Sequence, residues 1–218
     1  MLEYFGHPFS SYTWKGEIAL IEKGADYAFR MLDPDHAENG ARFKELWPVG
    51  KFPLLIDGDR VLFESSIIIE YLDRKYPGAP CLIPEAFDAA LEVRQFDRIF
   101  DLHVMAKMQE MVFDALRPPE ERIPSIRQQV NDALETVYGW LEGQLKGREW
   151  ATLQGFSLAD CAAAPSLFYA DWVHRIDPKY EALTAYRARL LARPSVKRCV
   201  EAARPYRPFF PLGAPDRD

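Results

Sequence analysis

The sequence predicts a two-domain protein, in which an α/β domain is followed by a domain built only of helices. Strand and helix signals alternate over residues 1–76. Three prolines then fall within residues 77–84, which disfavours both a helix interior and a central strand. Beyond them, apolar residues recur at three- and four-residue steps, the period of a helix, along most of residues 85–218. We therefore expect domains at 1–76 and 85–218, joined by a linker at 77–84.

The elements of the first domain follow from local patterns. Gly24 ends the first helix, and Asp57-Gly58 is a turn dipeptide suited to a hairpin. The resulting order is βαβαββα, which fits a four-stranded mixed sheet. The expected strands are Leu2–Phe5, Tyr27–Leu32 and one on either side of Asp57-Gly58, and the expected helices are Trp14–Lys23, Ala41–Trp47 and Ser66–Lys75.

The second domain is expected to hold five helices and an irregular tail from Pro205. Ser157 can cap the third helix, and Asp160 can accept a bond from the Ser157 backbone N–H, which makes a capping-box variant. We interpret this pair as a folding signal. The expected helices are Glu85–Leu116, Ile123–Lys146, Leu158–His174, Pro178–Ala192 and Ser195–Ala203.

Composition excludes several classes of function. The net charge is −6 over 218 residues, and the basic residues are scattered, so we expect no nucleic-acid partner. The three cysteines form neither a CxxC pair nor a metal-ligand spacing with the four histidines, so we expect reduced thiols and no metal. No apolar run approaches the roughly 20 residues that span a bilayer, and no export signal opens the chain. We expect a soluble, cytoplasmic protein with no membrane association.

The segment 51–72 carries the first candidate site. A proline opens a strand here, and a helix begins at an acid and two hydroxyl residues, Glu64, Ser65 and Ser66. Backbone N–H groups at a helix start, with a serine hydroxyl, bind a carboxylate, and Glu64 could pair with an ammonium group beside it. Alternatively, the serines only cap the helix.

A second candidate site lies in residues 8–20, between the first strand and the first helix. Ser10, Ser11 and Thr13 stand before the apolar part of the helix, where hydroxyl groups serve as N-caps. A serine hydroxyl at this place could also donate to a bound thiolate and, with the helix N-terminus, favour the anion.

Together the two segments resemble the soluble glutathione transferases of the bacterial, serine type, akin to their theta, zeta and delta classes. The resemblance implies a thioredoxin-like first domain with a cis-proline at Pro53, a homodimer, and glutathione as co-substrate. It implies a detoxifying transferase that joins the glutathione thiolate to a small hydrophobic electrophile. Peroxidase, dehalogenase, isomerase or ether-cleaving chemistry on the same fold, or a non-catalytic binding or regulatory role, are the alternatives.

The resemblance also assigns residues. It places Ser10 on the catalytic serine, although Ser11 or Tyr4 could activate the thiol instead. On the long helix after the linker we expect a pocket for the second substrate, although packing in the core also explains its apolar residues. Phe168, Tyr169 and Trp172 on a later helix carry the same ambiguity. The tail aromatics Phe209 and Phe210 could fold back over either domain. The expected glutathione-binding residues are Ser11, Lys51, Phe52, Pro53, Glu64 and Ser65, and those of the second pocket are Phe100, His103 and Met108.

Overall fold

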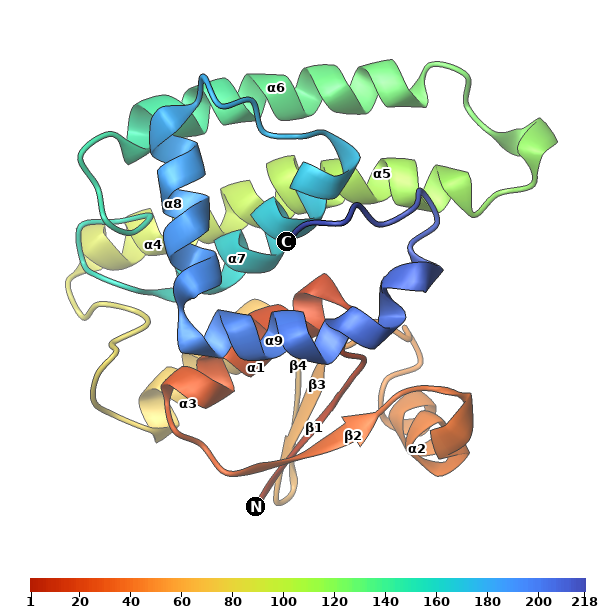
Figure 1. Ribbon diagram of the computed structural model, residues 1–218. Coiled ribbons are helices and arrows are strands. Elements are labelled where there is room, and N and C mark those ends of the chain that lie inside the picture. Colours follow the sequence, from red (N-terminus) through yellow and green to blue (C-terminus); the bar gives the residue numbers. More distant parts are fainter.

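A computed structural model describes residues 1–218, and it shows two domains in contact (Figure 1). The domain that contains the sheet lies below the helical domain in this view. The first 75 residues form a four-stranded sheet of order β2-β1-β3-β4 with three helices. Strand β1 pairs parallel with β2 and antiparallel with β3, and β3 pairs antiparallel with β4. The predicted order βαβαββα is confirmed. The elements are β1 Leu2–Gly6, α1 Ser11–Glu22, β2 Tyr27–Met31, a 3-10 turn Pro34–His36, α2 Ala37–Leu46, β3 Leu54–Asp57, β4 Arg60–Phe63 and α3 Ser65–Lys75.

The rest of the chain is helical. The helices are α4 Phe87–Ile99, α5 Ala106–Ala115, α6 Ile126–Leu145, α7 Leu158–Val173, α8 Glu181–Ala192 and α9 Pro194–Ala203. A π-helical segment, η2 Phe100–Met105, joins α4 to α5, so the expected single helix is interrupted by wider turns. The expectation of an irregular tail was wrong for Arg204–Phe209, which forms a 3-10 helix with Pro205 at a position in its first turn where no N–H is needed.

Several helices begin at other residues than expected. Helix α1 starts at Ser11 rather than Trp14 because Ser10 caps it, and α2 starts at Ala37 because the preceding 3-10 turn leads directly into it. The predicted capping box is confirmed: the Ser157 N–H donates to Asp160 at 2.9 Å, at the start of α7. No helix and no strand lies within residues 77–84, so we keep these residues as the proposed linker.

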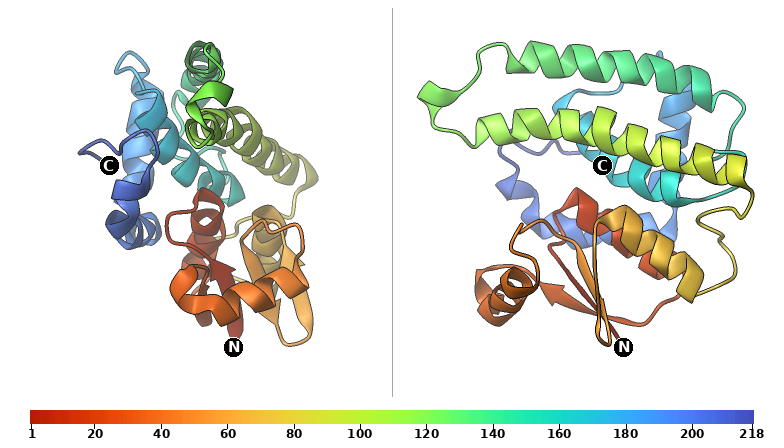
Figure 2. Two further views of the ribbon diagram at one scale, coloured as in Figure 1. Left: turned by 90° about the vertical axis from the view of Figure 1, so that its right-hand side faces the viewer. Right: turned by 180° about the vertical axis from the view of Figure 1, so that it is seen from behind.

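The two faces of the sheet are covered differently (Figure 2). Helices α1 and α3 pack together on the face toward the helical domain, where α1 also contacts α7 and α9. Tyr4 and Leu55 pair across the sheet and belong to one large core that runs through both domains. Their neighbours Phe5 and Leu54 point to the other face, into a small core under Phe43 of α2. The large shared core fixes α1, and the loop before it, against the helical domain.

No helix in the structure combines the length and the apolar character that crossing a bilayer requires.

Candidate functional site

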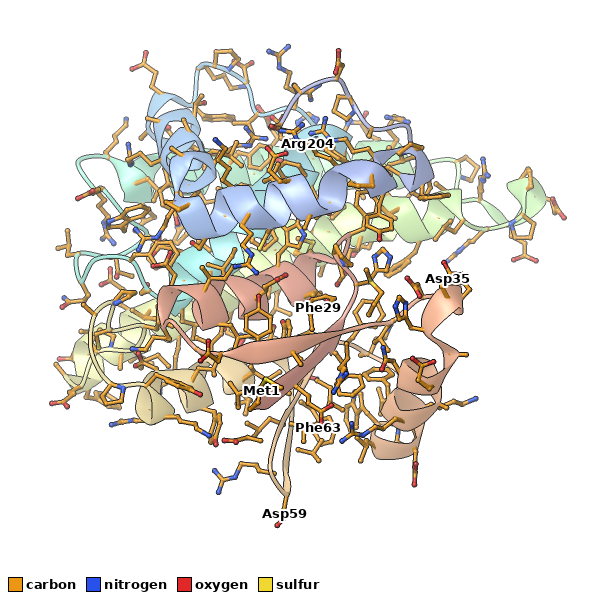
Figure 3. All side chains as sticks on the ribbon, turned by 60° about the horizontal axis from the view of Figure 1, so that its bottom comes forward. Met1, Phe29, Asp35, Asp59, Phe63 and Arg204 are labelled. Carbon is orange, nitrogen blue, oxygen red and sulfur yellow. The ribbon has the colours of Figure 1, made fainter.

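Three segments meet at one end of the sheet. Phe5 of β1 stands opposite Leu54 of β3, which stands opposite Phe63 of β4. Because β1 and β4 run in the same direction and β3 runs against them, the residues after β1, before β3 and after β4 share this end. Asp59 marks the hairpin turn at the opposite end of β4 (Figure 3). The segments are residues 7–10, residues 51–53 and residues 64–65.

The segment before β3 contains a cis peptide bond between Phe52 and Pro53, as the family resemblance implied. Pro53 is buried and Phe52 is half-buried, with its ring 6.3 Å from the ring of Phe43. Lys51 is exposed, and its ammonium lies 5.9 Å from the ring centroid of Phe113 on α5. Lys51 therefore stands where the first domain faces the helical domain.

The start of α3 has an unusual backbone. Glu64, the N-cap residue, has a φ of 64° and is the one non-glycine residue of the chain with a positive φ. Such a conformation costs about 1–3 kcal/mol and is concentrated at functional sites. The Glu64 carbonyl accepts from Ile68, while its side chain is exposed and makes no capping bond. Ser65 is buried as the first residue of the helix. Because Glu64 follows directly after the last residue of β4, the N-terminus of α3 lies at this end of the sheet.

Ser10 is the N-cap of α1. Its Oγ accepts from the Thr13 N–H at 3.3 Å, and the residue is half-buried. A hydroxyl accepts and donates at the same time, so the Ser10 proton stays free to point outward. Ser11 is 6% exposed in the first turn of the helix. Ser10 therefore combines a fixed oxygen with a free donor.

Tyr4 does not share this position. Its side chain is fully buried, and its hydroxyl donates to the Thr13 carbonyl at 2.7 Å, inside the core. Burial raises the pKa of the Tyr4 phenol well above its usual range. Because the hydroxyl is committed within the fold, it is not presented at the sheet end.

A buried cluster of charged residues lies next to the start of α3, between the two domains. The Lys15 ammonium, on a residue that is 1% exposed, lies 2.5 Å from Asp97 and 2.7 Å from Asp101, and it donates to the Ser66 hydroxyl at 2.8 Å. Arg98 donates to both aspartates and to Ser66. We call these five residues the Lys15 cluster. It joins α1 and the start of α3 to α4 and η2, and it holds Ser66, the neighbour of Ser65.

Sequence reasoning missed the two aspartates of the Lys15 cluster. An acidic pair at i and i+4 within an otherwise apolar helix face was the available signal. Tyr12 lies close to the same charges. Burial raises the pKa of its phenol above the usual range, and the carboxylate of Asp101 raises it further, with a smaller effect of Glu64. Tyr12 is therefore a neutral hydrogen-bonding group at this site.

The residues expected for the second-substrate pocket do not come together. Phe100 is fully buried and packs against Phe96 and Tyr186, and Met108 is 3% exposed in the same core. His103 is exposed and lines an outer groove of about 470 Å³ between α6 and the continuous run of α4, η2 and α5. No lining residue of that groove comes from the first domain. The groove residues are Ile99, His103, Lys107, Ala133, Thr136, Val137 and Trp140.

Other aromatic residues of the helical domain contact residues 7–10, the loop before α1 that contains Ser10, which we call the serine loop. The ring of Phe9 packs 5.7 Å from Tyr169, 6.3 Å from Trp172 and 6.4 Å from Phe210. The tail thus folds back so that Phe210 covers the loop. The ring centroids of Tyr206 and His7 lie 4.5 Å apart.

A proline-bearing sheet end that faces a helical domain, next to a serine-capped helix, defines a two-domain protein with a thioredoxin-like half. A model of the glutathione S-transferase N-terminal domain matches residues 5–80, and a model of the glutathione S-transferase C-terminal domain matches residues 104–194. The chain therefore belongs to the glutathione S-transferase family.

Individual relatives cover most of the chain. A stringent starvation protein A homolog of Coxiella burnetii is 27% identical over 77% of this chain and 75% of its own length. Glutathione S-transferase 1 of Dianthus caryophyllus is 29% identical over 76% of each chain. The crystal structure of a glutathione S-transferase from Methylobacillus flagellatus, with glutathione bound, superposes with a TM-score of 0.81 at 26% identity, over 91% of this chain and 98% of that one.

Proposed function

We propose that this protein is a glutathione transferase that joins the glutathione thiolate to a small hydrophobic electrophile. The observation that carries the proposal is the convergence of Ser10, Pro53 and Glu64-Ser65 at one end of the sheet. The glutathione-bound relative from Methylobacillus flagellatus, similar over nearly its whole length, supports the same ligand here.

Each part of the tripeptide has a candidate partner. The N–H groups at the start of α3 and the Ser65 hydroxyl would bind the γ-glutamyl carboxylate, because a helix N-terminus favours an anion. The exposed Glu64 carboxylate would pair with the adjacent ammonium. The backbone of Phe52 would pair with the central cysteine, and Lys51 would reach the glycine carboxylate.

Ser10 would activate the sulfur. A free thiol has a pKa near 8.5, so only a small part of it is thiolate at neutral pH. The Ser10 hydroxyl would donate a hydrogen bond to the sulfur, next to the N-terminus of α1, and the thiol proton would leave to solvent. The thiolate would then form a C–S bond with the electrophilic carbon as the leaving group departs. Catalysis would consist of positioning and of stabilising the anion. Ser11, in the first turn of α1, would support the binding of glutathione.

Calorimetric titration with glutathione tests the two roles separately. We expect Ser65→Ala to weaken binding about tenfold or more, because a charge-assisted bond is lost. We expect Ser10→Ala to bind with little change but to lose the thiolate absorbance and the conjugation rate. Ser125→Ala, which removes the serine that precedes α6 in the helical domain, is the matched control. An unchanged conjugation rate in Ser10→Ala contradicts the catalytic role of Ser10.

The protein would act as a homodimer. Exposed apolar side chains follow one face of α4, with Phe87 77% and Leu91 52% exposed, and Ile67 of α3 is 51% exposed. Replacing Phe87 and Leu91 together by glutamate should give a monomer in sedimentation velocity. A wild-type monomer at micromolar concentration contradicts the dimer.

Two other functions compete with conjugation. The same thiolate could serve peroxide reduction, dehalogenation, isomerisation or ether cleavage, and product analysis over a panel of electrophiles separates these reactions. A regulatory role is favoured by the similarity to stringent starvation protein A homologs, whose name states no transferase activity. Binding of glutathione without any thiolate signal would support that role.

The three unpaired cysteines are consistent with action in the reducing cytoplasm.

A further inference from the structure

The backbone of Phe9, the residue before Ser10, is held on both sides by side chains. Its N–H donates to Nδ1 of His7 at 3.1 Å, and its carbonyl accepts from the Tyr169 hydroxyl at 3.0 Å. One residue earlier, the Pro8 carbonyl accepts from the Trp14 indole at 2.5 Å. Loops rarely have each successive backbone group bonded to a side chain, because most loop groups bond to water.

Tyr169 differs from the other two side chains because it comes from the helical domain. His7 and Trp14 lie within the loop and the helix that follows it, whereas Tyr169 is 160 residues away in the sequence. Its side chain is 3% exposed, and its ring packs 5.3 Å from Trp14. Burial keeps the pKa of the Tyr169 phenol well above its usual range, so the hydroxyl remains a donor.

We propose that Tyr169 is a positioning residue for Ser10: its hydroxyl, bonded to the Phe9 carbonyl, fixes the serine loop against the helical domain and so aims the Ser10 hydroxyl at the bound sulfur. This inference rests on the proposed function of Ser10. The Phe9 carbonyl and the Ser10 N–H belong to one rigid peptide plane, so a shift of the carbonyl rotates the plane from which the Ser10 side chain extends. A hydrogen bond to a thiolate weakens steeply when its donor turns away.

The variant Tyr169→Phe removes only the hydroxyl. We expect the pKa of the bound glutathione thiol, followed by thiolate absorbance against pH, to rise by about one unit, which lowers the thiolate fraction up to about tenfold at neutral pH. The value of kcat/KM at neutral pH should fall by the same factor and should recover as the pH is raised. The Kd for glutathione, from calorimetry, should change less than about twofold.

Tyr138→Phe is the matched control. Tyr138 is also fully buried in the helical domain, and its hydroxyl donates to a backbone carbonyl, that of His174, at 3.2 Å, away from the loop. This variant loses a comparable bond, and we expect it to leave the thiol pKa unchanged. Hydrogen exchange supplies a second readout, in which the amides of residues 9–13 should exchange faster in Tyr169→Phe and not in Tyr138→Phe.

The outcomes separate the two proposals. A Tyr169→Phe protein with wild-type thiol pKa and pH profile overturns the positioning role, and so does a loss of activity that does not recover at high pH. A wild-type protein that binds no glutathione, or leaves its thiol pKa at the value in solution, overturns the proposed function instead. In that case the exchange comparison alone decides whether Tyr169 holds the loop.

Discussion

The Asp160 carboxylate and the Lys15 ammonium are both buried charges, but they connect different parts of the molecule. Asp160 accepts four bonds within the helical domain, from the Ala151 N–H at 2.9 Å, the Ser157 N–H at 2.9 Å, the Ser157 hydroxyl at 3.1 Å and the Tyr186 hydroxyl at 2.6 Å. Lys15 joins the first domain to the helical domain through Asp97 of α4 and Asp101 of η2. The first centre therefore stabilises one domain, whereas the second sets the geometry between the domains where we place the glutathione site.

The comparison predicts its largest effect on stability at Asp160. Replacing this fully buried residue by alanine takes the acceptor from four buried donors, so we expect Asp160→Ala to lower the free energy of unfolding by about 3–5 kcal/mol. Glutathione affinity per folded molecule should stay unchanged. Denaturant unfolding and calorimetry measure the two quantities. Asp132→Ala, an exposed carboxylate on α6, is the control and should cost less than about 0.5 kcal/mol. A loss below 1 kcal/mol at Asp160 would contradict its role as a folding centre.

Lys15 should affect both stability and binding. Lys15→Met leaves two buried aspartates with only Arg98 as counter-charge, which should cost about 2–4 kcal/mol. Because Lys15 also holds Ser66 at the start of α3, we expect glutathione to bind about tenfold more weakly.

Lys23→Met is the control for that prediction. The Lys23 ammonium is also buried, and it pairs with Asp73 at 3.0 Å and with two carbonyls of the proposed linker. This variant should lose comparable stability while keeping its affinity for glutathione. Equal losses of glutathione affinity in Lys15→Met and Lys23→Met would show that Lys15 contributes to stability alone and has no separate effect on the geometry of the glutathione site.

Glu135 offers a third, more exposed charged centre, for which we expect the smallest effect. Hydrogen bonds from Lys179 and His174 lower the pKa of Glu135 from 4.5 to about 2. Its side chain is 37% exposed, so screening limits the contribution to below about 1 kcal/mol at neutral pH.

The pH dependence of that contribution has a definite sign. The folded pKa of Glu135 lies below the unfolded one, so the stabilisation is present above pH 4.5 and is lost as the pH falls toward about 2. The difference in unfolding free energy between wild type and Glu135→Gln should shrink over that range. A difference that stays constant from neutral to acid pH disproves the assignment.

The two buried centres also differ in how well the sequence predicts them. Ser157 and Asp160 are three residues apart, so their capping box follows from a local pattern and is confirmed. Lys15 and Asp101 are separated by 86 residues, and no local pattern indicates that they meet. The order of strands and helices along the first domain was predictable for the same reason as the capping box, because hairpin and helix signals are local.

The residues expected to line the second-substrate pocket show most clearly what the sequence alone does not predict. His103 and Met108 lie on one long helix, and the sequence alone does not say which face of it turns toward the serine loop. The π-helical segment Phe100–Met105 adds wider turns, so the phase of the helix after it differs from that of a regular α-helix. His103 consequently faces the outer groove with α6, and Met108 enters the core. The return of Phe210 to Phe9 depends on tertiary packing and had no sequence signal beyond its aromatic ring.

The most direct measurement is a crystal structure of the protein grown with glutathione. We predict that the γ-glutamyl carboxylate lies on the first N–H groups of α3 and that the sulfur lies within hydrogen-bonding distance of the Ser10 hydroxyl. Clear density for the tripeptide elsewhere, or none at this end of the sheet at saturating concentration, would contradict that placement.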